Sequence, residues 1–270
     1  MDIRPAAVAG MFYPADATAL RGAVDRLLAA AAPAPDDAPA LKALIAPHAG
    51  YVYSGPVAAS AYARLRPATA GIRRVVLLGP AHRVPFRGLA LPGAQQFATP
   101  LGNVPVDAAA IAAARRLPEA GDSALAHADE HSLEVQLPFL QRVLGAFSVV
   151  PVVVGDAAAE TVAAILDLLW GGPETLIVVS SDLSHYHPYR EAQAIDRASA
   201  DAILGLAARL DHDEACGATP VNGLLLAARR RGLVPALLDL RNSGDTAGDR
   251  RRVVGYAAFA FSEGGSHGAH

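Results

Sequence analysis

Short apolar runs alternate with longer segments of helical periodicity along most of the chain. The runs are rich in valine, isoleucine and leucine and end at turn residues, which is typical of buried strands. Strands are therefore predicted at 41–46, 74–79, 147–154, 175–180, 233–240 and 252–261. Helices are predicted at 17–31, 56–65, 107–117, 130–144, 158–170, 189–209 and 219–231. This alternation predicts an α/β fold with a central, mostly parallel or mixed sheet flanked by helices.

The predicted elements belong to a single domain. No linker-like boundary interrupts residues 1–262, and a chain of 270 residues is long enough to bury a sizeable core. Ser54, Gly55 and Pro56 offer a cap and a first turn for the helix predicted at 56–65. The Pro- and Ala-rich segment 32–39 is predicted to be a surface loop, and the tail 263–270 to be disordered.

Charge and cysteine content exclude several classes of protein. The net charge is −3 and no basic stripe is present, which argues against nucleic acid and against an acidic membrane surface as partners. The longest uncharged stretch, 43–63, contains Pro47, Pro56 and His48, which do not suit a membrane span. The single cysteine, Cys216, rules out an internal disulfide. We therefore expect a soluble cytoplasmic protein without a secretory signal.

Two histidines follow predicted strands directly. His48 comes after the strand 41–46 and a proline, and His82 comes after the strand 74–79 and a proline. If these strands are neighbours in the sheet, the two imidazoles converge on one rim, where ligands of such sheets bind. Two neutral imidazoles at one site indicate a transition-metal centre. The alternative is that each histidine only satisfies a loop carbonyl, and no HxxxH, HExxH or CxxC pattern decides between the two.

A third polar cluster follows the strand 175–180. Asp182 and His185 stand three residues apart, so the carboxylate can orient the imidazole or share a metal with it. The alternative for Asp182 is a cap on the following helix. Glu130 and His131 open another predicted helix, where they could supply acid/base chemistry or bind substrate. The alternative there is that acids complement the helix dipole beside an incidental histidine.

One late polar segment offers a carboxylate. Asp245 lies in the sequence Asn-Ser-Gly-Asp, between two predicted strands, where turn chemistry is the alternative explanation. Two histidines and one carboxylate on one face form the arrangement that suits ferrous iron and dioxygen, so Asp245 is the candidate third ligand beside His48 and His82. Cys216 precedes an apolar helix and is interpreted as a small buried residue rather than a nucleophile.

These motifs together resemble those of the Memo family, whose bacterial and archaeal members are called AmmeMemoRadiSam system protein B. The resemblance runs in order over essentially the whole chain. The segments that carry it are 5–14, 46–55, 78–82, 130–134, 180–185, 216–217 and 255–258.

The resemblance implies a fold similar to that of class III extradiol dioxygenases, such as the protocatechuate 4,5-dioxygenase catalytic subunit. Those enzymes hold Fe(II) with two histidines and a glutamate. By position, His48 and His82 match the histidine ligands, and His185 matches a histidine that acts on substrate as acid/base. The eukaryotic branch has a cysteine in the region of Thr246, whereas this chain offers Asp245 and Thr246 there. The resemblance also implies a functional link to a radical-SAM protein and an AMMECR1-type protein.

Three functions remain open from the sequence. The first is a non-heme Fe(II) protein that acts with O2 on a catechol-like substrate, in which His185 moves protons and Asp182 and His131 orient it. The second is a zinc-dependent hydrolase with Asp182 or Glu130 as base, and copper also suits the histidines. The third is a non-catalytic pocket that binds a peptide or a partner enzyme. Metal analysis distinguishes the first two.

Overall fold

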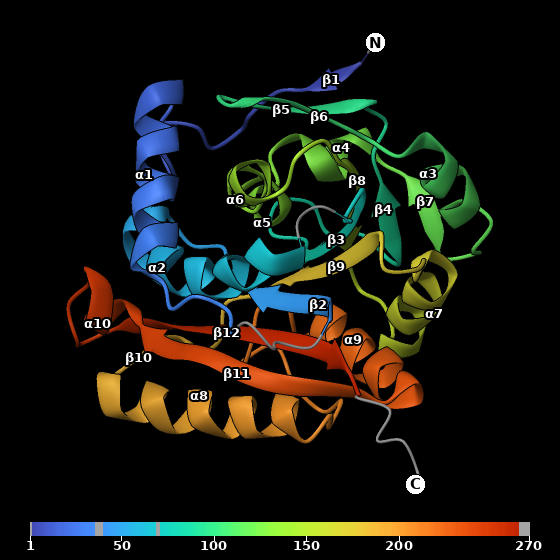
Figure 1. Cartoon of the computed structure of the whole chain (residues 1–270). Coiled ribbons are helices and arrows are strands. Elements are labelled where there is room, and N and C mark those ends of the chain that lie inside the picture. The colour runs from blue at the N-terminus through green and yellow to red at the C-terminus, as the bar shows by residue number, and fades with distance from the viewer. Residues whose placement is uncertain (1, 36–39, 69–70, 265–270) are drawn as a thin grey trace, which may run out of the picture.

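The computed structural model describes residues 2–35, 40–68 and 71–264. Its larger sheet has nine strands (Figure 1). These are β2 (Leu41–Ala46), β3 (Arg74–Pro80), β4 (Leu89–Leu91), β7 (Ala120–Asp122), β8 (Ser148–Val154), β9 (Thr175–Ser180), β10 (His185–His187), β11 (Leu233–Asn242) and β12 (Val253–Glu263). A smaller sheet consists of β1 (Ile3–Arg4), β5 (Gln96–Thr99) and β6 (Gly102–Pro105).

The order of the larger sheet is β10-β12-β2-β9-β3-β8-β4-β7, with β11 paired to the outer side of β12. Its centre is parallel, because β2, β9, β3 and β8 all run in one direction. On either side the sheet turns antiparallel, where β12 pairs with β2 and β4 pairs with β8. The predicted α/β fold with a mixed central sheet is therefore confirmed.

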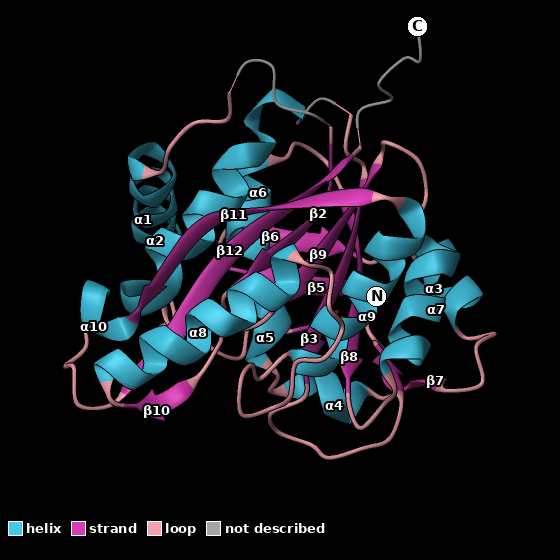
Figure 2. Ribbon diagram, turned by 90° about the horizontal axis from the view of Figure 1, so that it is seen from below, coloured by secondary structure: helices cyan, strands magenta, loops and turns pink. Residues whose placement is uncertain are grey.

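Helices cover both faces of this sheet. They are α1 (Ala17–Ala30), α2 (Tyr51–Tyr62), α3 (Ala108–Ala114), α4 (Ala124–Ala128), α5 (His131–Glu134), α6 (Leu137–Val143), α7 (Ala159–Leu169), α8 (Tyr189–Leu204), α9 (Ala218–Arg231) and α10 (Ser243–Thr246). Helices α1, α2 and α6 pack together on one face, and α7 and α9 pack together on the other. Figure 2 shows α8 lying along the long antiparallel pair β11 and β12.

The core consists of two apolar layers separated by the sheet. Successive side chains of a strand point to opposite faces, so neighbours along β2 and β3 enter different layers. Leu44 and Leu77 belong to the layer under α1, α2 and α6, whereas Ile45 and Leu78 belong to the layer under α7 and α9. The parallel strands are therefore buried on both faces, which is why they read as continuous apolar runs.

All six predicted strands are present, each within three residues of its predicted ends. The predicted helix 56–65 begins earlier than expected, because α2 starts at Tyr51 and encloses Pro56. Pro56 cannot donate to the carbonyl of Val52 one turn before it, and Val52 lies at the exposed surface, where solvent can satisfy that oxygen.

Two other helix predictions are too long. The segment 130–144 is split into α5 and α6 around Val135 and Gln136, and α6 carries a proline in its first turn. The segment 189–209 is helical only to Leu204, because Leu206 adopts a left-handed backbone with φ of 52°.

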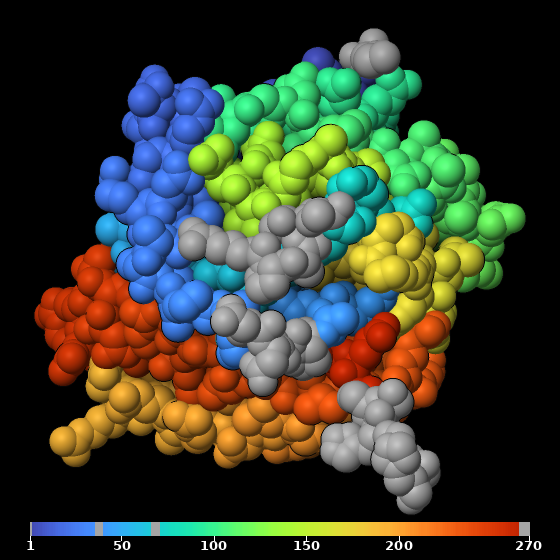
Figure 3. Space-filling model, in the orientation of Figure 1, coloured from blue at the N-terminus to red at the C-terminus, as the bar shows by residue number. Residues whose placement is uncertain are grey.

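β12 continues to Glu263, the first residue of the segment predicted as the tail. Residues 36–39 of the predicted loop and 265–270 of the tail lie outside the described residues. No helix among the described residues has both the length and the apolar character needed to cross a membrane. Figure 3 shows the blue surface of α1 adjoining the red surface of the C-terminal segments, although these stand at opposite ends of the sequence.

Candidate metal centre

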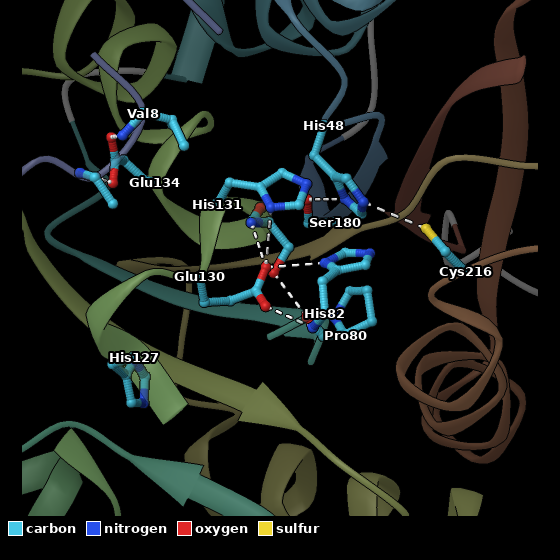
Figure 4. A network of polar contacts seen from close by, with 12 residues as sticks. Val8, His48, Pro80, His82, His127, Glu130, His131, Glu134, Ser180 and Cys216 are labelled. Carbon is cyan, nitrogen blue, oxygen red and sulfur yellow. Dashed lines mark hydrogen bonds and ion pairs between the residues drawn. The ribbon is translucent and has the colours of Figure 1, made fainter. Parts of the chain in front are cut away.

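Three histidines meet at the edge of the sheet where its parallel strands end. His48 follows β2, His82 follows β3, and His131 is the first residue of α5. One ring nitrogen from each lies within 4.8 Å of the other two (Figure 4). The convergence of His48 and His82 predicted from the sequence is confirmed, since their ring centroids lie 5.1 Å apart. It follows from the topology, because β2 and β3 flank β9 on either side.

Hydrogen bonds fix the tautomer of His48. The Ser180 hydroxyl donates to the carbonyl of Ser132 at 2.6 Å and accepts from the Gln136 amide at 2.7 Å. Because a hydroxyl has only one hydrogen, its 2.9 Å contact with Nδ1 of His48 requires the imidazole to donate. His48 therefore carries its proton on Nδ1 and its lone pair on Nε2, which lies 3.3 Å from Sγ of Cys216.

Glu130 orients His82 in a similar way. One carboxylate oxygen accepts from Nδ1 of His82 at 2.9 Å and from the amide of Ser132 at 2.8 Å, and the other accepts from the amide of His82 at 2.6 Å. Burial alone would raise the pKa of Glu130, but the hydrogen bonds from His82 and Ser132 outweigh it and lower the pKa to about 2. A carboxylate behind an imidazole is the usual support of a metal-binding histidine.

His131 reaches the site because α5 packs directly on β3. A Cβ atom at Gly79 of β3 would lie 2.7 Å from Oγ of Ser132, so only glycine permits this approach. The ring of His131 stacks on that of His82 at 4.6 Å. Its Nδ1 atom is buried without a hydrogen-bond partner, and burial together with the charge of His82 lowers the pKa of His131 to about 4.

These three imidazoles fit a divalent transition metal. Burial lowers the pKa of His48 as well, and the neighbouring histidines lower it further. Neutral imidazole is the form that binds metal, and its nitrogen suits zinc, copper, iron and nickel. His48 and His82 are held with Nδ1 as donor, which leaves the lone pair of each on Nε2. Nδ1 of His131 makes no hydrogen bond and lies 3.5 Å from the carboxylate of Glu130.

The histidines open into a cleft that also contains Asp182 and His185. A cavity of about 710 Å³ is lined by all three histidines, Asp182, His185 and Cys216. A second cavity of about 660 Å³ adjoins it and shares His131, Asp182 and His185. Asp182 accepts from the backbone amide of His48 at 2.7 Å, and burial raises its pKa to about 7. Burial lowers the pKa of His185, while a hydrogen bond to the Leu183 backbone acts in the opposite direction.

Asp245, the carboxylate expected as third ligand, is placed elsewhere. It belongs to α10, where it forms a capping box with Asn242 and accepts a hydrogen bond from the hydroxyl of Tyr189. It is not part of the convergent group, whose third member is His131. The turn chemistry weighed for this segment explains the difference, since the carboxylate is engaged with its own backbone. Asp182, expected to orient His185, instead contacts the backbone of His48.

Sequence reasoning missed Cys216 as a residue of the cleft. Its Sγ lies 3.3 Å from Nε2 of His48. Gly217 was the available signal, because a Cβ atom there would lie 2.7 Å from Ser181. A glycine that permits so close an approach brings the residue before it to the end of β9, beside the other candidate side chains.

The N-terminal segment is tied to the helix that carries His131. The buried carboxylate of Glu134 accepts hydrogen bonds from Arg4, from the amides of Ala7 and Val8, and from the hydroxyl of Tyr13. Figure 4 shows Glu134 beside Val8. A charge with this many partners is stable without water. The segment therefore anchors α5 at Glu134, the last residue of that helix.

Comparisons with known proteins agree with this architecture. Residues 4–260 match the model of the family described as Memo-like protein. A MEMO1 family protein of Methanopyrus kandleri is 38% identical over 97% of this chain and 99% of its own length. MEMO1 family proteins of Sulfolobus acidocaldarius and Aquifex aeolicus are 36% and 35% identical over 97% of this chain and 100% of their own lengths. The chain belongs to the Memo family.

Proposed function

We propose that this chain is a mononuclear non-heme iron protein in which His48, His82 and His131 hold Fe(II). The adjoining cleft would take a small catechol-like substrate for O2-dependent oxidation, as in the class III extradiol dioxygenases that the sequence resembles. The observation that carries the proposal is the convergence of three ring nitrogens within 4.8 Å, with two tautomers fixed by hydrogen bonds. A ferrous ion would supply the one-electron chemistry with O2 that no side chain provides.

The donor set itself favours an anionic substrate. Three imidazoles are neutral, whereas two imidazoles and a carboxylate carry one negative charge. The site proposed here therefore leaves the full charge of a divalent ion uncompensated by its ligands. The nearest carboxylate, Glu130, is already engaged with His82 and Ser132. A catecholate, which binds as an anion, complements such a centre.

Other residues of the cleft bind and move protons. His185 lines both cavities and is half-buried, so its imidazole can take the proton of a substrate hydroxyl. Asp182 holds the backbone of His48 and thereby fixes the position of that ring. The aromatic side chains of Phe12 and Tyr256 line the neighbouring cavity and offer apolar faces on which a substrate ring could stack.

A zinc-dependent hydrolase is the second candidate, and one specific observation favours it. Three histidines with an open position are the ligand set that catalytic zinc uses to lower the pKa of bound water. In that case Asp182, rather than Glu130, would serve as base, because Glu130 already orients His82. The metal that the protein carries separates the two candidates.

The test is metal content together with O2 uptake. We expect protein purified after growth with both iron and zinc to hold about one iron per chain, measured by mass spectrometry of the metal. We expect His48→Ala, His82→Ala and His131→Ala each to lower iron affinity at least tenfold, because a lost ligand leaves two imidazoles. His212→Ala is the matched control, since this exposed histidine lines the same cavity outside the convergent group.

Different results would lead to different conclusions. Iron with catechol-dependent O2 uptake supports the proposal. Zinc with no O2 uptake supports the hydrolase instead. Equal metal content in His82→Ala and wild-type protein would contradict both candidates, because each depends on the three-histidine group.

A further inference from the structure

A groove bounded by α1 and α2 lies outside the cleft. Its volume is about 870 Å³, within the size range of small-molecule sites. The two helices are in contact beside it, since a Cβ atom at Gly55 of α2 would lie 2.9 Å from Cδ1 of Leu27 of α1. Among the described residues that line the groove, none belongs to the three-histidine group. The groove is therefore a candidate site distinct from the metal centre.

The walls of the groove are apolar. Residues one turn apart lie on the same face of a helix, and such sets form both walls. On α1 they are Ala23, Leu27 and Ala30, and on α2 they are Val52 and Pro56. Small and aliphatic side chains along two adjacent helices leave room for an extended apolar chain. Burial of such a chain would remove the apolar walls from water, which is favourable.

The rim of the groove carries two of the three most exposed large apolar side chains in the described part of the chain. Met11 is 72% exposed and Val52 is 66% exposed. Contiguous apolar surface of this kind marks grooves that bind ligands or partners. The methionine side chain is flexible and polarizable, so Met11 can adapt to the shape of a bound molecule.

One positive charge at the groove has no anion. Arg26 of α1 is exposed and forms no ion pair or hydrogen bond with another described residue. The other two charged residues of the lining compensate each other, because Nε of Arg241 lies 2.9 Å from Oδ1 of Asp239. Asp239 also accepts a hydrogen bond from the hydroxyl of Ser60 at 2.9 Å. Arg26 is therefore the charge that a ligand of this groove would meet.

We propose that this groove is a second ligand site, which takes a single molecule with an unbranched apolar chain and a carboxylate head group, of the fatty-acid class. The chain lies between α1 and α2, and the carboxylate pairs with Arg26. A guanidinium presents a planar fork of donors that matches a carboxylate. The concave shape between two helices suits one enclosed molecule rather than a flat membrane surface. The site is independent of the proposed iron function, because it uses no residue of the metal centre.

Two probes with the same chain and opposite head charges test this proposal. Dodecanoate and dodecyltrimethylammonium are titrated by calorimetry into the full-length protein, each below its micelle-forming concentration. We expect dodecanoate to bind about tenfold more tightly, because charge-assisted hydrogen bonds are the stronger kind. Arg26→Gln is expected to remove this preference. Arg21→Gln is the matched control and should keep it, since Arg21 is also an exposed cation of α1 but does not line the groove.

A second variant tests the apolar wall. Val52→Asp places a negative charge at the rim, and the high exposure of Val52 allows the fold to accept it. We expect dodecanoate binding to weaken about tenfold, because like charges repel and apolar contact is lost. Leu168→Asp is the matched control, since Leu168 is an exposed apolar residue of α7, outside the groove. Unchanged dodecanoate affinity in Val52→Asp would overturn the proposal.

Other results would also overturn it. These are equal affinity for the two probes, no binding of either, or a preference that survives in Arg26→Gln. Binding to phosphatidylglycerol vesicles without binding of monomeric dodecanoate would assign the groove to a membrane surface. A wild-type dimer that dissociates in Val52→Asp, measured by sedimentation, would assign it to a second copy of the chain. His82→Ala should bind dodecanoate as wild-type protein does, so failure of the iron proposal leaves this one standing.

Discussion

Replacement of Glu130 by glutamine tests whether one carboxylate both caps α5 and orients a metal-binding ring. The buried carboxylate accepts three hydrogen bonds: two from His82 and one from the amide of Ser132. Glutamine has nearly the same shape, but one of its two terminal atoms is a donor. If the amide nitrogen faces the backbone of His82, two donors oppose each other there. If it faces Nδ1 of His82, the bonds to the ring and to Ser132 are both lost.

The magnitude follows from these two orientations. The first loses one hydrogen bond to a charged group, worth about 1.5–3 kcal/mol, and leaves a buried donor unpaired. The second loses two such bonds but allows the ring to shift its proton to Nε2, which removes the metal-binding lone pair. We therefore expect Glu130→Gln to lower the free energy of unfolding by about 2–4 kcal/mol. We expect metal affinity to fall about 10–100-fold, the usual effect of removing such a supporting carboxylate.

Two assays measure these effects separately. Urea unfolding of metal-free protein at pH 7 gives the change in stability, and calorimetric titration with Zn²⁺ gives the change in affinity. Asp122→Asn is a suitable control, because that carboxylate pairs with Arg115 at the exposed surface, away from the cleft. Wild-type affinity and stability in Glu130→Gln would refute the reasoning, since neither amide orientation can keep all three bonds.

Two further predictions concern the packing that supports the site. Gly79→Ala is expected to lower the free energy of unfolding by about 1–3 kcal/mol and to weaken metal binding, because the new methyl group pushes Ser132 and α5 away from β3. Normal metal affinity of this variant, measured by titration, would contradict the prediction. Asp196 is a buried residue of α8 that accepts a hydrogen bond from the amide of Ser184. Burial raises its pKa to about 6, above the ordinary aspartate pKa of about 3.9, so the folded state holds this proton more tightly and loses stability as pH rises from about 4 to 6. Asp196→Asn should remove that loss, up to about 3 kcal/mol, and a stability difference from wild type that does not vary with pH in urea unfolding would disprove it.

The sheet could be predicted from sequence because its central strands are buried on both faces. Runs such as 176–179 contain only the apolar residues that such strands favour, and their ends are marked by polar or turn residues. The short strands near one edge of the sheet gave no comparable signal. Residues 89–91 and 120–122 form β4 and β7 with three residues each, and their pairing depends on neighbours distant in sequence.

Helix ends were less predictable because tertiary contacts decide them. α2 starts at Tyr51 rather than at Pro56. The amide of Tyr51 donates to the carbonyl of Phe12, and the hydroxyl of Tyr51 donates to the carbonyl of Val135. Both partners lie far away along the chain. The local signal of Ser54 and Pro56, which favours a later start, is overruled by these contacts.

The candidate site shows the same division between local and distant information. His48 and His82 could be placed together because each follows a strand, and parallel neighbours end at one edge. The third position could not be inferred from that rule, because His131 does not follow a strand. It depends on a four-residue helix whose approach is set by the missing side chain of Gly79. The carboxylate favoured by ligand chemistry, Asp245, was already used by a local cap.

The start of α5 and the orientation of His82 in the candidate metal centre depend on the same side chain. Glu130 is the N-cap of this helix and the hydrogen-bond partner of His82, so the same side chain fixes the start of the helix and the direction of a ring on another element. At the other end of α5, Glu134 binds the N-terminal segment through Arg4. A change that frays this helix must move His131 and release His82 together. Stability and metal affinity should consequently fall in parallel for variants of α5, but independently for variants of the distant helix faces.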